Sequence, residues 1–471
     1  MQNITSTSIM YEFENAQLGD ERLTKRLCRL AERFERRPQA SIPEATGSWG
    51  QACGAYRFFD NEEVDPEDIL ASHTERTLER AQTESLLLAV ADTTSLNYRD
   101  RSNTEEPAPS WTGGLGPIGN STDKAFGLWL QSLLAFTPEG LPLGLLGARS
   151  WARDPKQFGA NHQRNQKPIE EKESYKWLKS YQTLQAVAAR TPHTHWVMVA
   201  DREADIYELF ELAMSQPNRP ALLIRLQHNR ALEESDHRLL AQLARQPQVG
   251  TLMVEVPRKK NQPARHAKLE IRFAPVRLRA PQLKSKRGPL ALWAIEAREA
   301  HPPRGVTPIC WRLLTTLAVH TVKQAIEKVQ WYCTRWGIEV FHKVLKSACA
   351  VEEAQLEETQ RLQRLITVRL VVAWRIMWLD RLRRERPTAP ISEILEEAQW
   401  KLLYGAVYGT GRLPRKKPTV GEGVRWIAQM GGFLGRRGDG NPGPQTLARG
   451  LARLDAISFG WKLAHEMNKC A

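Results

Sequence analysis

Two short apolar runs constrain the fold of this chain most, because both end on the same tripeptide. Leu86 to Asp92 closes on Val-Ala-Asp, and so does Trp196 to Asp201. Short apolar runs bounded by polar residues are typical of buried strands. A carboxylate that ends such a strand lies at the carboxyl edge of a sheet, where open α/β sheets bind ligands. Helix capping or turn formation is the ordinary alternative for either aspartate alone.

The neighbouring segments alternate between strand and helix patterns. Strands are expected over 126–136, 141–151 and 221–226, and helices over 168–190 and 203–215. Strands that interleave with helices indicate an α/β core with a mixed sheet.

The chain outside this core divides into regions of different character. Residues 1–70 are predicted to be mainly helical, and 71–380 to form the α/β domain. Alternating strands and basic, proline-containing loops predict a β-rich insertion over about 228–320, and residues 381–471 are again predicted to be helical. A length of 471 residues is sufficient for such a division, because domains usually contain about 100–200 residues.

The charge balance points to a polyanionic partner. The net charge is +14 and the pI about 9.6, which favours nucleic acid over the rivals, a membrane surface or an acidic protein. The most apolar stretch, Leu365 to Leu379, is interrupted by Arg369 and Arg375 and is shorter than the roughly 18 apolar residues of a membrane span. The first residues lack a basic region followed by an apolar core, so no signal peptide is expected. Six scattered cysteines without a Cys-x-x-Cys pair favour reduced thiols in a cytoplasm and give no zinc motif.

A basic helix is expected from Asp20 to Arg37. At 100° per residue, one arc of about 120° collects all of its cations, and Leu23, Leu27, Leu30 and Phe34 fill a separate arc. The cations of this stripe are Arg22, Lys25, Arg26, Arg29, Arg33, Arg36 and Arg37. The stripe favours contact with phosphates, and a solvated basic face is the alternative.

A second helix, near 326–347, places an acid among cations. Tyr332, Arg335, Glu339 and Lys346 fall at about 0°, −60°, −20° and −40° on a helical wheel, so they share one side, with Lys343 beside them. A carboxylate among cations is explained if a metal ion and phosphate oxygens lie between them, because Mg²⁺ is often held by carboxylates together with substrate phosphates. A surface ion pair between Arg335 and Glu339 is the simpler alternative.

These residues resemble a known family. Asp92, Asp201 and Glu339 match the DDE triad of transposases with an RNase H-like core, and Tyr332, Arg335, Glu339 and Lys346 match the Y-x2-R-x3-E-x6-K signature of the branch that mobilises bacterial insertion sequences. The similarity extends through the segments Gly54-Ala55-Tyr56-Arg57-Phe58, Asp92-Thr93-Thr94-Ser95-Leu96, Asp201-Arg202-Glu203-Ala204-Asp205-Ile206 and Phe341-His342-Lys343.

The resemblance implies an activity and a set of roles. The expected enzyme nicks DNA, forms and opens a hairpin at each transposon end, and joins that end to target DNA. The triad would hold two Mg²⁺ ions, for which Mn²⁺ can substitute. Tyr332, Arg335 and Lys346 would hold a 5′ phosphate of the strand that is not transferred.

Further contacts follow from the same resemblance. Trp311 would stack on a flipped base, although a tryptophan in a β-rich segment is often a core residue. Arg225 and Lys343 would contact DNA near the active site. Gly337 departs from the family pattern, which has a charged residue at this position. A glycine inside a helix lowers the stability of the helix by about 1 kcal/mol. The missing side chain could also remove a DNA contact.

The resemblance also gives the flanking regions their functions. Residues 1–70 would bind the terminal inverted repeats, partly through the basic stripe, and residues 381–471 would pair two protomers in a synaptic complex. Such a protein would work in the bacterial cytoplasm, on the nucleoid. Two other readings stay open. One is a non-catalytic DNA-binding protein, such as a transposition inhibitor or a domesticated descendant, and the other is a metal-dependent nuclease without joining activity.

Overall fold

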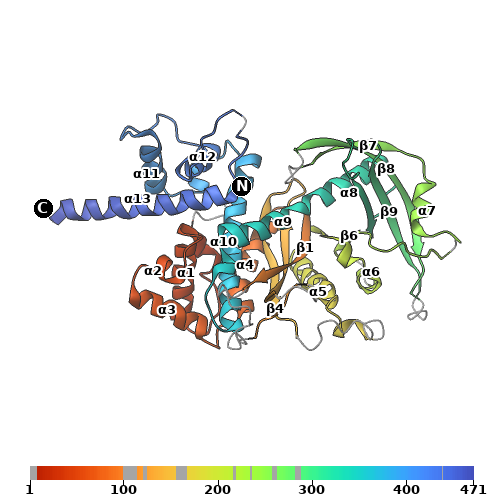
Figure 1. Cartoon of the computed structure of the whole chain (residues 1–471), viewed down its shortest axis with the longest axis horizontal. Coiled ribbons are helices and arrows are strands. Elements are labelled where there is room, and N and C mark those ends of the chain that lie inside the picture. The colour runs from red at the N-terminus through yellow and green to blue at the C-terminus, as the bar shows by residue number, and fades with distance from the viewer. Residues whose placement is uncertain are drawn as a thin grey trace.

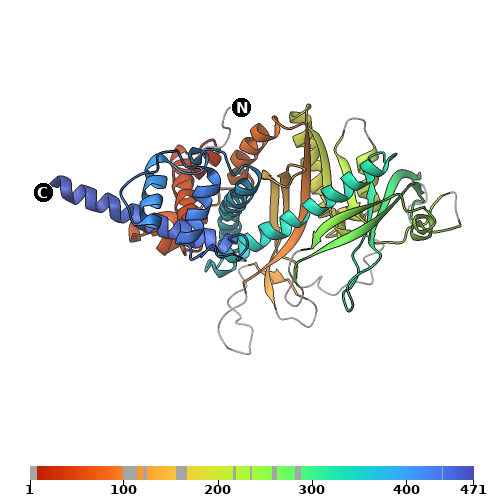
Figure 2. The ribbon, with the colours of Figure 1, turned by 90° about the horizontal axis from the view of Figure 1, so that it is seen from above.

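The computed structural model describes residues 8–98, 114–119, 125–154, 167–215, 219–233, 236–256, 263–281, 288–437 and 439–470. Helices of the two chain ends gather at one end of the elongated molecule, and a large sheet occupies the other end (Figures 1 and 2). The expectation about a signal peptide rests mostly on residues 1–7, which lie outside the described residues. None of the described helices is long and apolar enough to cross a membrane.

The centre of the sheet has five strands in the order β4-β3-β1-β5-β6. Their bounds are β1 Leu86–Asn97, β3 Phe126–Phe136, β4 Pro142–Trp151, β5 His195–Ala200 and β6 Ala221–Arg225, with the short β2 (Gly116–Pro117) beside β3. β1 pairs with β5, and β5 with β6, in parallel, while β3 is antiparallel to both β1 and β4. This order, with these directions, is that of an RNase H-like core, so the predicted fold class is confirmed.

The β-rich insertion continues the same sheet. Its strands are β7 Gly250–Val256, β8 Arg265–Leu278, β9 Leu290–Glu299 and β10 Cys310–Thr315, with the short helix α7 (Leu239–Ala244) before β7. β10 pairs antiparallel with β6, so the insertion adds four antiparallel strands to the edge of the core.

Each face of the sheet has its own hydrophobic core. One core contains Leu87, Ala89 and Ala91 of β1 and packs against α5 (Tyr175–Arg190) and α6 (Tyr207–Met214). The other contains Leu88 and Val90, which alternate with the first set, and packs against the helices that follow β10. This alternation is the period of two expected of a strand, and it assigns Asp92, two residues after Val90, to the second face.

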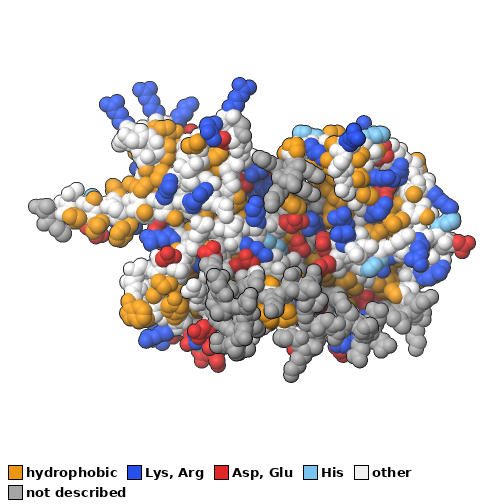
Figure 3. Space-filling model, in the orientation of Figure 1, with side chains coloured by type: hydrophobic (Ala, Val, Ile, Leu, Met, Phe, Trp, Pro, Cys, Tyr) orange, Lys and Arg blue, Asp and Glu red, His pale blue; other side chains and the backbone are white. Residues whose placement is uncertain are grey.

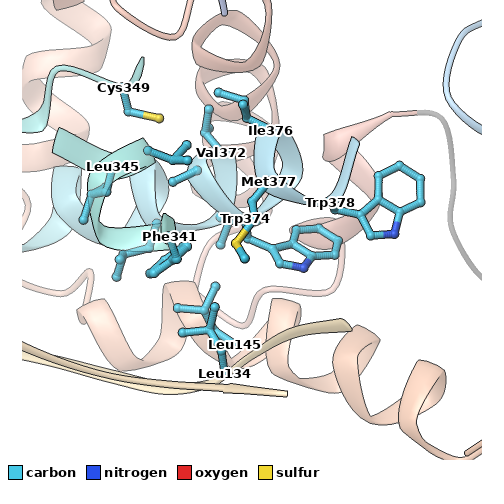
Figure 4. Packing of buried hydrophobic residues seen from close by; sticks show 14 of the residues in the cluster. Leu134, Leu145, Phe341, Leu345, Cys349, Val372, Trp374, Ile376, Met377 and Trp378 are labelled. Atoms are coloured by element: carbon cyan, nitrogen blue, oxygen red, sulfur yellow. The ribbon is translucent and has the colours of Figure 1, made fainter. Parts of the chain in front are cut away.

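The helices of that second face form one continuous run of chain. They are α8 Val322–Thr334, α9 Trp336–Lys343, a π-helical turn Val344–Ala348, and the long α10 Thr359–Glu385. Figure 4 shows α10 residues such as Val372, Trp374 and Met377 packed against Phe341 and Leu345 and toward Leu134 and Leu145 of the sheet.

The arginines that interrupt the apolar stretch of α10 are buried as well. Arg364 donates to the carbonyls of Phe59 and Val64, Arg369 to those of Pro38, Ala40 and Cys349, and Arg375 pairs with Glu35 at 3.2 Å. Buried cations need such partners, because an unpaired charge in a protein interior is costly. α10 is therefore the central helix that joins the N-terminal helices to the sheet.

Helices make up both ends of the chain. The N-terminal ones are α1 Glu21–Arg36, α2 Ile42–Thr46, α3 Trp49–Asp60 and α4 Pro66–Ala81, preceded by the 3-10 turn η1 (Ile9–Glu12). The C-terminal ones are α11 Glu397–Tyr408, α12 Val420–Met430 and α13 Pro444–Cys470. α4 spans the boundary expected near residue 70, and α10 spans the one expected near residue 380.

Several predicted elements differ in detail. The helix expected over 168–190 begins only at Tyr175, after a separate 3-10 turn over Ile169–Glu171. The helix expected over 203–215 begins at Tyr207, because Asp201 caps a 3-10 turn over Arg202–Ala204 first.

Candidate active site

A row of functional side chains crosses the carboxyl edge of the parallel strands. Ala91 of β1 is level with Ala200 of β5, and Ala200 is level with Ile224 of β6. The next residue on each strand is therefore level with its neighbours, and these residues are Asp92, Asp201 and Arg225. The structure thus brings together three residues that are far apart in the sequence.

One expectation about this row is wrong. Asp92 was predicted to end its strand, but β1 continues to Asn97. The reason is that β1 has two neighbours: its parallel partner β5 stops at Ala200, whereas β3 continues to pair with it as far as Asn97 and Gly127. Asp92 therefore sits mid-strand, at the point where the parallel pairing stops. Asp201 does follow the last residue of its strand.

The helical run after β10 carries Glu339 to this row, but the run is not the single helix that was expected. α8 ends at Thr334, Arg335 forms the junction, and α9 carries Glu339. The π-helical turn that follows contains Lys346. Such turns change which side of a helix a residue faces and are frequent at functional sites, so the relation of Lys346 to the other three residues does not follow the α-helical wheel.

Arg335 lies between two of the acids. Its Nη1 is 3.6 Å from Asp92 Oδ2, and its Nη2 donates to Glu339 Oε1 at 2.5 Å. The ion pair between Arg335 and Glu339 that was considered from the sequence is therefore present, and it lies only partly at the surface: 13% of the Arg335 side chain and 34% of the Glu339 side chain are exposed.

The surroundings of Asp92 disfavour the ionised form of its carboxyl. Burial, together with the negative charges of Asp201 and Glu339, raises the pKa of its carboxyl to about 6, while the Thr93 amide and Arg335 oppose the shift. Asp201 and Glu339 are thus each close enough to Asp92 to repel its carboxylate. A perturbed acid in such surroundings is a common mark of a functional site.

The side chains of this row are of the chemical type that a divalent cation such as Mg²⁺ prefers. Mg²⁺ prefers carboxylate oxygens, and positive charge beside Asp92 would relieve the repulsion from Asp201 and Glu339. In the part of the chain that the structure describes, no three His, Cys, Asp or Glu side chains are close enough to share one metal ion. Arg335 supplies the positive charge between Asp92 and Glu339 in this arrangement.

Tyr332 and Trp311 meet beside the row. Trp311 lies on β10, half-buried, and its ring makes an edge contact with Tyr332, with the centroids 5.7 Å apart. Burial raises the pKa of the Tyr332 phenol, and the Arg335 and Arg225 guanidinium groups oppose this. Two buried polar atoms, Tyr332 Oη and Arg335 Nε, make no hydrogen bond of normal geometry within the described chain. Unsatisfied buried groups of this kind require an explanation, and a ligand is one.

Lys346 and Lys343, the two lysines near this row, have different surroundings. Lys346 Nζ donates to the carbonyl of Ser95 at 2.5 Å and lies 3.5 Å from Glu352, which in turn accepts from the amide of Asn97. Lys346 is thereby held against the end of β1. Lys343 is exposed.

The sequence reasoning assigned no role to His342 and Ser132. Ser132 pairs with Asp92 across the β1–β3 ladder, and its Oγ is 3.3 Å from Nε2 of His342, one turn after Glu339. Burial, with the nearby Lys346 charge, lowers the pKa of His342 to about 3, so its ring is neutral. This contact ties the helix of Glu339 to the strand beside Asp92. The only sequence signal was the position of His342 three residues after Glu339.

Gly337 has a different role from the one expected. It is buried, and a Cβ atom there would lie 2.9 Å from the Phe136 ring and 3.6 Å from the Met377 methyl group. The idea that this glycine removes a DNA contact is therefore wrong, because the position faces the core. Its small size lets α9 approach β3 closely.

The basic stripe lies on α1, as predicted, but its two halves differ. Arg22, Lys25, Arg26 and Arg29 are exposed. Arg33, in contrast, donates to the carbonyls of Ala45 and Thr46, and Arg36 and Arg37 pair with Asp455 of α13. Within the exposed half Arg22 pairs with Asp20 and Lys25 with Glu21, but these pairs lie on the surface, so this half is the part that can meet another molecule.

Segments near both ends of the chain match known protein families. Residues 8–64, which include α1 to α3, match the family model "Transposase DNA-binding", and residues 371–470 match the "Transposase Tn5 dimerisation domain". A cryo-EM structure of a piggyBac transposase synaptic complex with hairpin DNA aligns with 80% of this chain and 72% of its own chain, at 9% identity and a TM-score of 0.38. At that score the likeness establishes neither a common fold nor a common activity. The two family matches lie on either side of an RNase H-like core, and together they support a Tn5-like transposase.

Proposed function

We propose that this transposase cleaves and joins DNA by metal-dependent phosphoryl transfer at Asp92, Asp201 and Glu339. The observation that carries the proposal is the electrostatic coupling of these acids: Asp92 is buried, with a pKa raised to about 6, and feels the charges of both others. A largely buried carboxylate that lies near two other negative charges favours a compensating cation beside it. Mg²⁺, or Mn²⁺ in its place, would supply that charge and activate a water or a 3′ hydroxyl for in-line attack on a phosphodiester.

The residues around the triad suit a scissile phosphate. Asp92, with neighbours on both sides, would take part in holding both ions, and Asp201 and Glu339 one each. Arg335 would turn from the carboxylates to the phosphate oxygens, which a guanidinium binds in the same bidentate way. Tyr332 Oη, which is buried and makes no hydrogen bond of normal geometry within the described chain, would donate to the same group. Lys346 and Lys343 would add positive charge along the strand.

A hairpin intermediate would give Trp311 a function. Joining the two strands of one end requires a sharp bend, and a base that leaves the stack needs an aromatic partner. Trp311 lies on the same sheet face as Asp92 and contacts Tyr332, so a base stacked on it would be next to the scissile phosphate. Arg225, level with Asp201, would hold the backbone beside it.

The flanking domains would select and pair the DNA ends. The exposed cations of α1 would contact the terminal inverted repeats, and two copies of the C-terminal domain would hold two ends in a synaptic complex. We place this activity in the bacterial cytoplasm, on the nucleoid.

A plasmid excision assay tests this function. The plasmid carries the inverted repeats that flank the gene, and purified protein is added with Mg²⁺ or Mn²⁺. The parent protein should release a fragment with hairpin ends and insert it into a second plasmid, whereas Glu339→Gln should do neither. Glu327→Gln, on the preceding helix, is the matched control and should behave as the parent.

Each alternative has its own outcome in this assay. Binding to the ends without cleavage by the parent would identify a DNA-binding regulator instead. Cleavage without any inserted product would identify a nuclease that does not join DNA. Full activity of Glu339→Gln would exclude Glu339 from the active site.

A further inference from the structure

A basic loop in the C-terminal domain stands apart from every site described above. It connects α11 to α12, and its exposed cations are Arg412, Arg415, Lys416 and Lys417. Within the described chain none of the four forms an ion pair with a carboxylate, nor does the exposed Arg425 on α12. The only acid of residues 409–419 or of the first turn of α12 is Glu422, and it accepts hydrogen bonds from Thr419.

The loop is held firmly at both ends. Gly409, in a left-handed conformation, closes α11, and its amide donates to the carbonyl of Gly405 at 2.8 Å. At the other end, Pro418 accepts from the amide of Ile391 at 3.0 Å, and Thr419 caps α12. Because the loop is anchored, its cations lose less conformational freedom on binding than they would on a free tail.

Aromatic packing stiffens the base of the loop. Tyr404, Tyr408 and Trp426 form a cluster with ring centroids 4.6 to 6.0 Å apart, and Trp426 Nε1 donates to Tyr408 Oη at 3.2 Å. Lys and Arg side chains project above α11 and α12, on the side away from α13 (Figures 1 and 3). A rigid support with outward cations is a typical surface for a phosphate backbone.

We propose that this loop binds the phosphate backbone of a DNA duplex, which gives the dimerisation domain a second task. The proposal rests on the proposed function only in that it requires a DNA partner. A second copy of the chain is the competing occupant. The part of α13 that projects beyond the domain exposes Phe459, Trp461, Leu463 and Met467. That surface is apolar, so it does not complement four cations.

Glu397 of α11, a carboxylate that feels the charge of Lys417, does not neutralise the loop. The Lys401 ammonium lowers the pKa of Glu397 most, and Lys417 contributes more weakly. The ion pair of Glu397 is with Lys401, at 2.6 Å. The loop cations therefore remain available to an external polyanion.

Salt dependence of DNA binding tests the proposal without any need for catalysis. The full-length protein is titrated with a random-sequence duplex in EDTA, over a range of salt concentrations. Each lost phosphate contact lowers the slope of log affinity against log salt by about 0.9. Lys416→Gln/Lys417→Gln should therefore lower it by about 2, and Arg412→Gln/Arg415→Gln by a similar amount. The matched control, Lys401→Gln/Arg384→Gln, removes two cations that already have carboxylate partners, and should leave the slope unchanged.

Two further measurements, of excision and of joining, show whether the bound duplex is target DNA or a transposon end. If the loop holds target DNA, the loop variants should excise the transposon normally and join it poorly; if it holds the DNA ends, excision should fall as well. Either result supports the proposal. A slope that does not change in either loop variant would overturn it, and so would a loss of dimers by sedimentation with the slope intact. Failure of the proposed catalysis would appear instead as an absence of cleavage, with these slopes unaffected.

Discussion

Arg335 Nη1 lies 3.6 Å from the carboxylate of Asp92, while Nη2 of the same guanidinium bonds to Glu339. A single cation thus connects a residue in the middle of β1 with a residue on α9. It sits at the junction between α8 and α9.

Replacing Arg335 by Gln should lower the rate of DNA cleavage more than it lowers the affinity for DNA. The variant leaves the acids without their cation and would leave a phosphate without a charge-assisted hydrogen bond, which contributes about 1.5–3 kcal/mol. Single-turnover cleavage of end DNA should fall about 10- to 100-fold. Arg335→Lys should not restore it, since an ammonium cannot bridge two groups with a planar fork. Parental rates in Arg335→Lys would show that charge alone suffices.

Asp92→Asn should stabilise the protein at neutral pH without metal. The folded-state pKa, about 6, is above the ordinary 3.8, so ionised Asp92 lowers stability. This cost is absent below about pH 4, develops between pH 4 and 6, and is complete above that. A shift of this size corresponds to roughly 2–3 kcal/mol.

Thermal unfolding in EDTA checks this sign. The melting temperature of Asp92→Asn should exceed that of the parent at pH 7.5 and equal it at pH 4. Asp68→Asn, at an exposed position on α4, is the control and should show no such gain. A lower melting temperature for Asp92→Asn at pH 7.5 would mean that the carboxylate is stabilising.

Gly337→Ala should destabilise the fold although alanine favours helices. The gain in helix propensity is about 1 kcal/mol, but the new methyl group meets the Phe136 ring at 2.9 Å. Overpacking of a core typically costs 1–3 kcal/mol, so a net loss of up to about 2 kcal/mol is expected by urea denaturation. Phe136→Leu in the same chain should recover part of it. Gly460→Ala, where nothing lies within 4 Å, should not destabilise.

Glu12→Gln should loosen the N-terminal segment. Glu12 accepts from Arg80 at 2.8 Å and from His73 at 2.6 Å, all buried. Although burial alone would raise the pKa of Glu12, Arg80 and His73 hold it well below its ordinary value. The carboxylate therefore contributes stability above about pH 4.5, and this is lost as the pH falls. Removing one partner of a buried pair costs about 3–5 kcal/mol. The difference in unfolding free energy between variant and parent should shrink below pH 4; a difference independent of pH would contradict this account.

The sequence predicted the sheet, and the strands that lead to Asp92 and Asp201, because both depend on local patterns. The apolar runs before Asp92 and Asp201 are strands, and the hairpin over 126–151 has the expected bounds. The length of β1 could not be predicted, since its last residues are held by pairing with β3 and not by their own composition. For the same reason the packing of Gly337 on Phe136 was missed, because the two residues meet only in the folded chain.

The interruption of the helix at Arg335 also could not be predicted from the sequence. A helical wheel assumes one continuous helix, whereas the structure has two helices and a π-helical turn between 322 and 348. The wheel still placed Tyr332, Arg335 and Glu339 together, because these three lie within two turns of one another. It could not show that Lys346 reaches the carbonyl of Ser95.

The most direct test of the central claim compares single and double variants of the triad in one cleavage assay. Groups that act as a unit have strongly non-additive effects on rate. Asp92→Asn, Asp201→Asn and Glu339→Gln should each reduce single-turnover cleavage of end DNA by at least about 100-fold, with end binding retained. Asp92→Asn/Glu339→Gln should be little slower than the slower single variant. If one single variant keeps the parental rate, or if the losses multiply in the double variant, the three carboxylates do not form one active site.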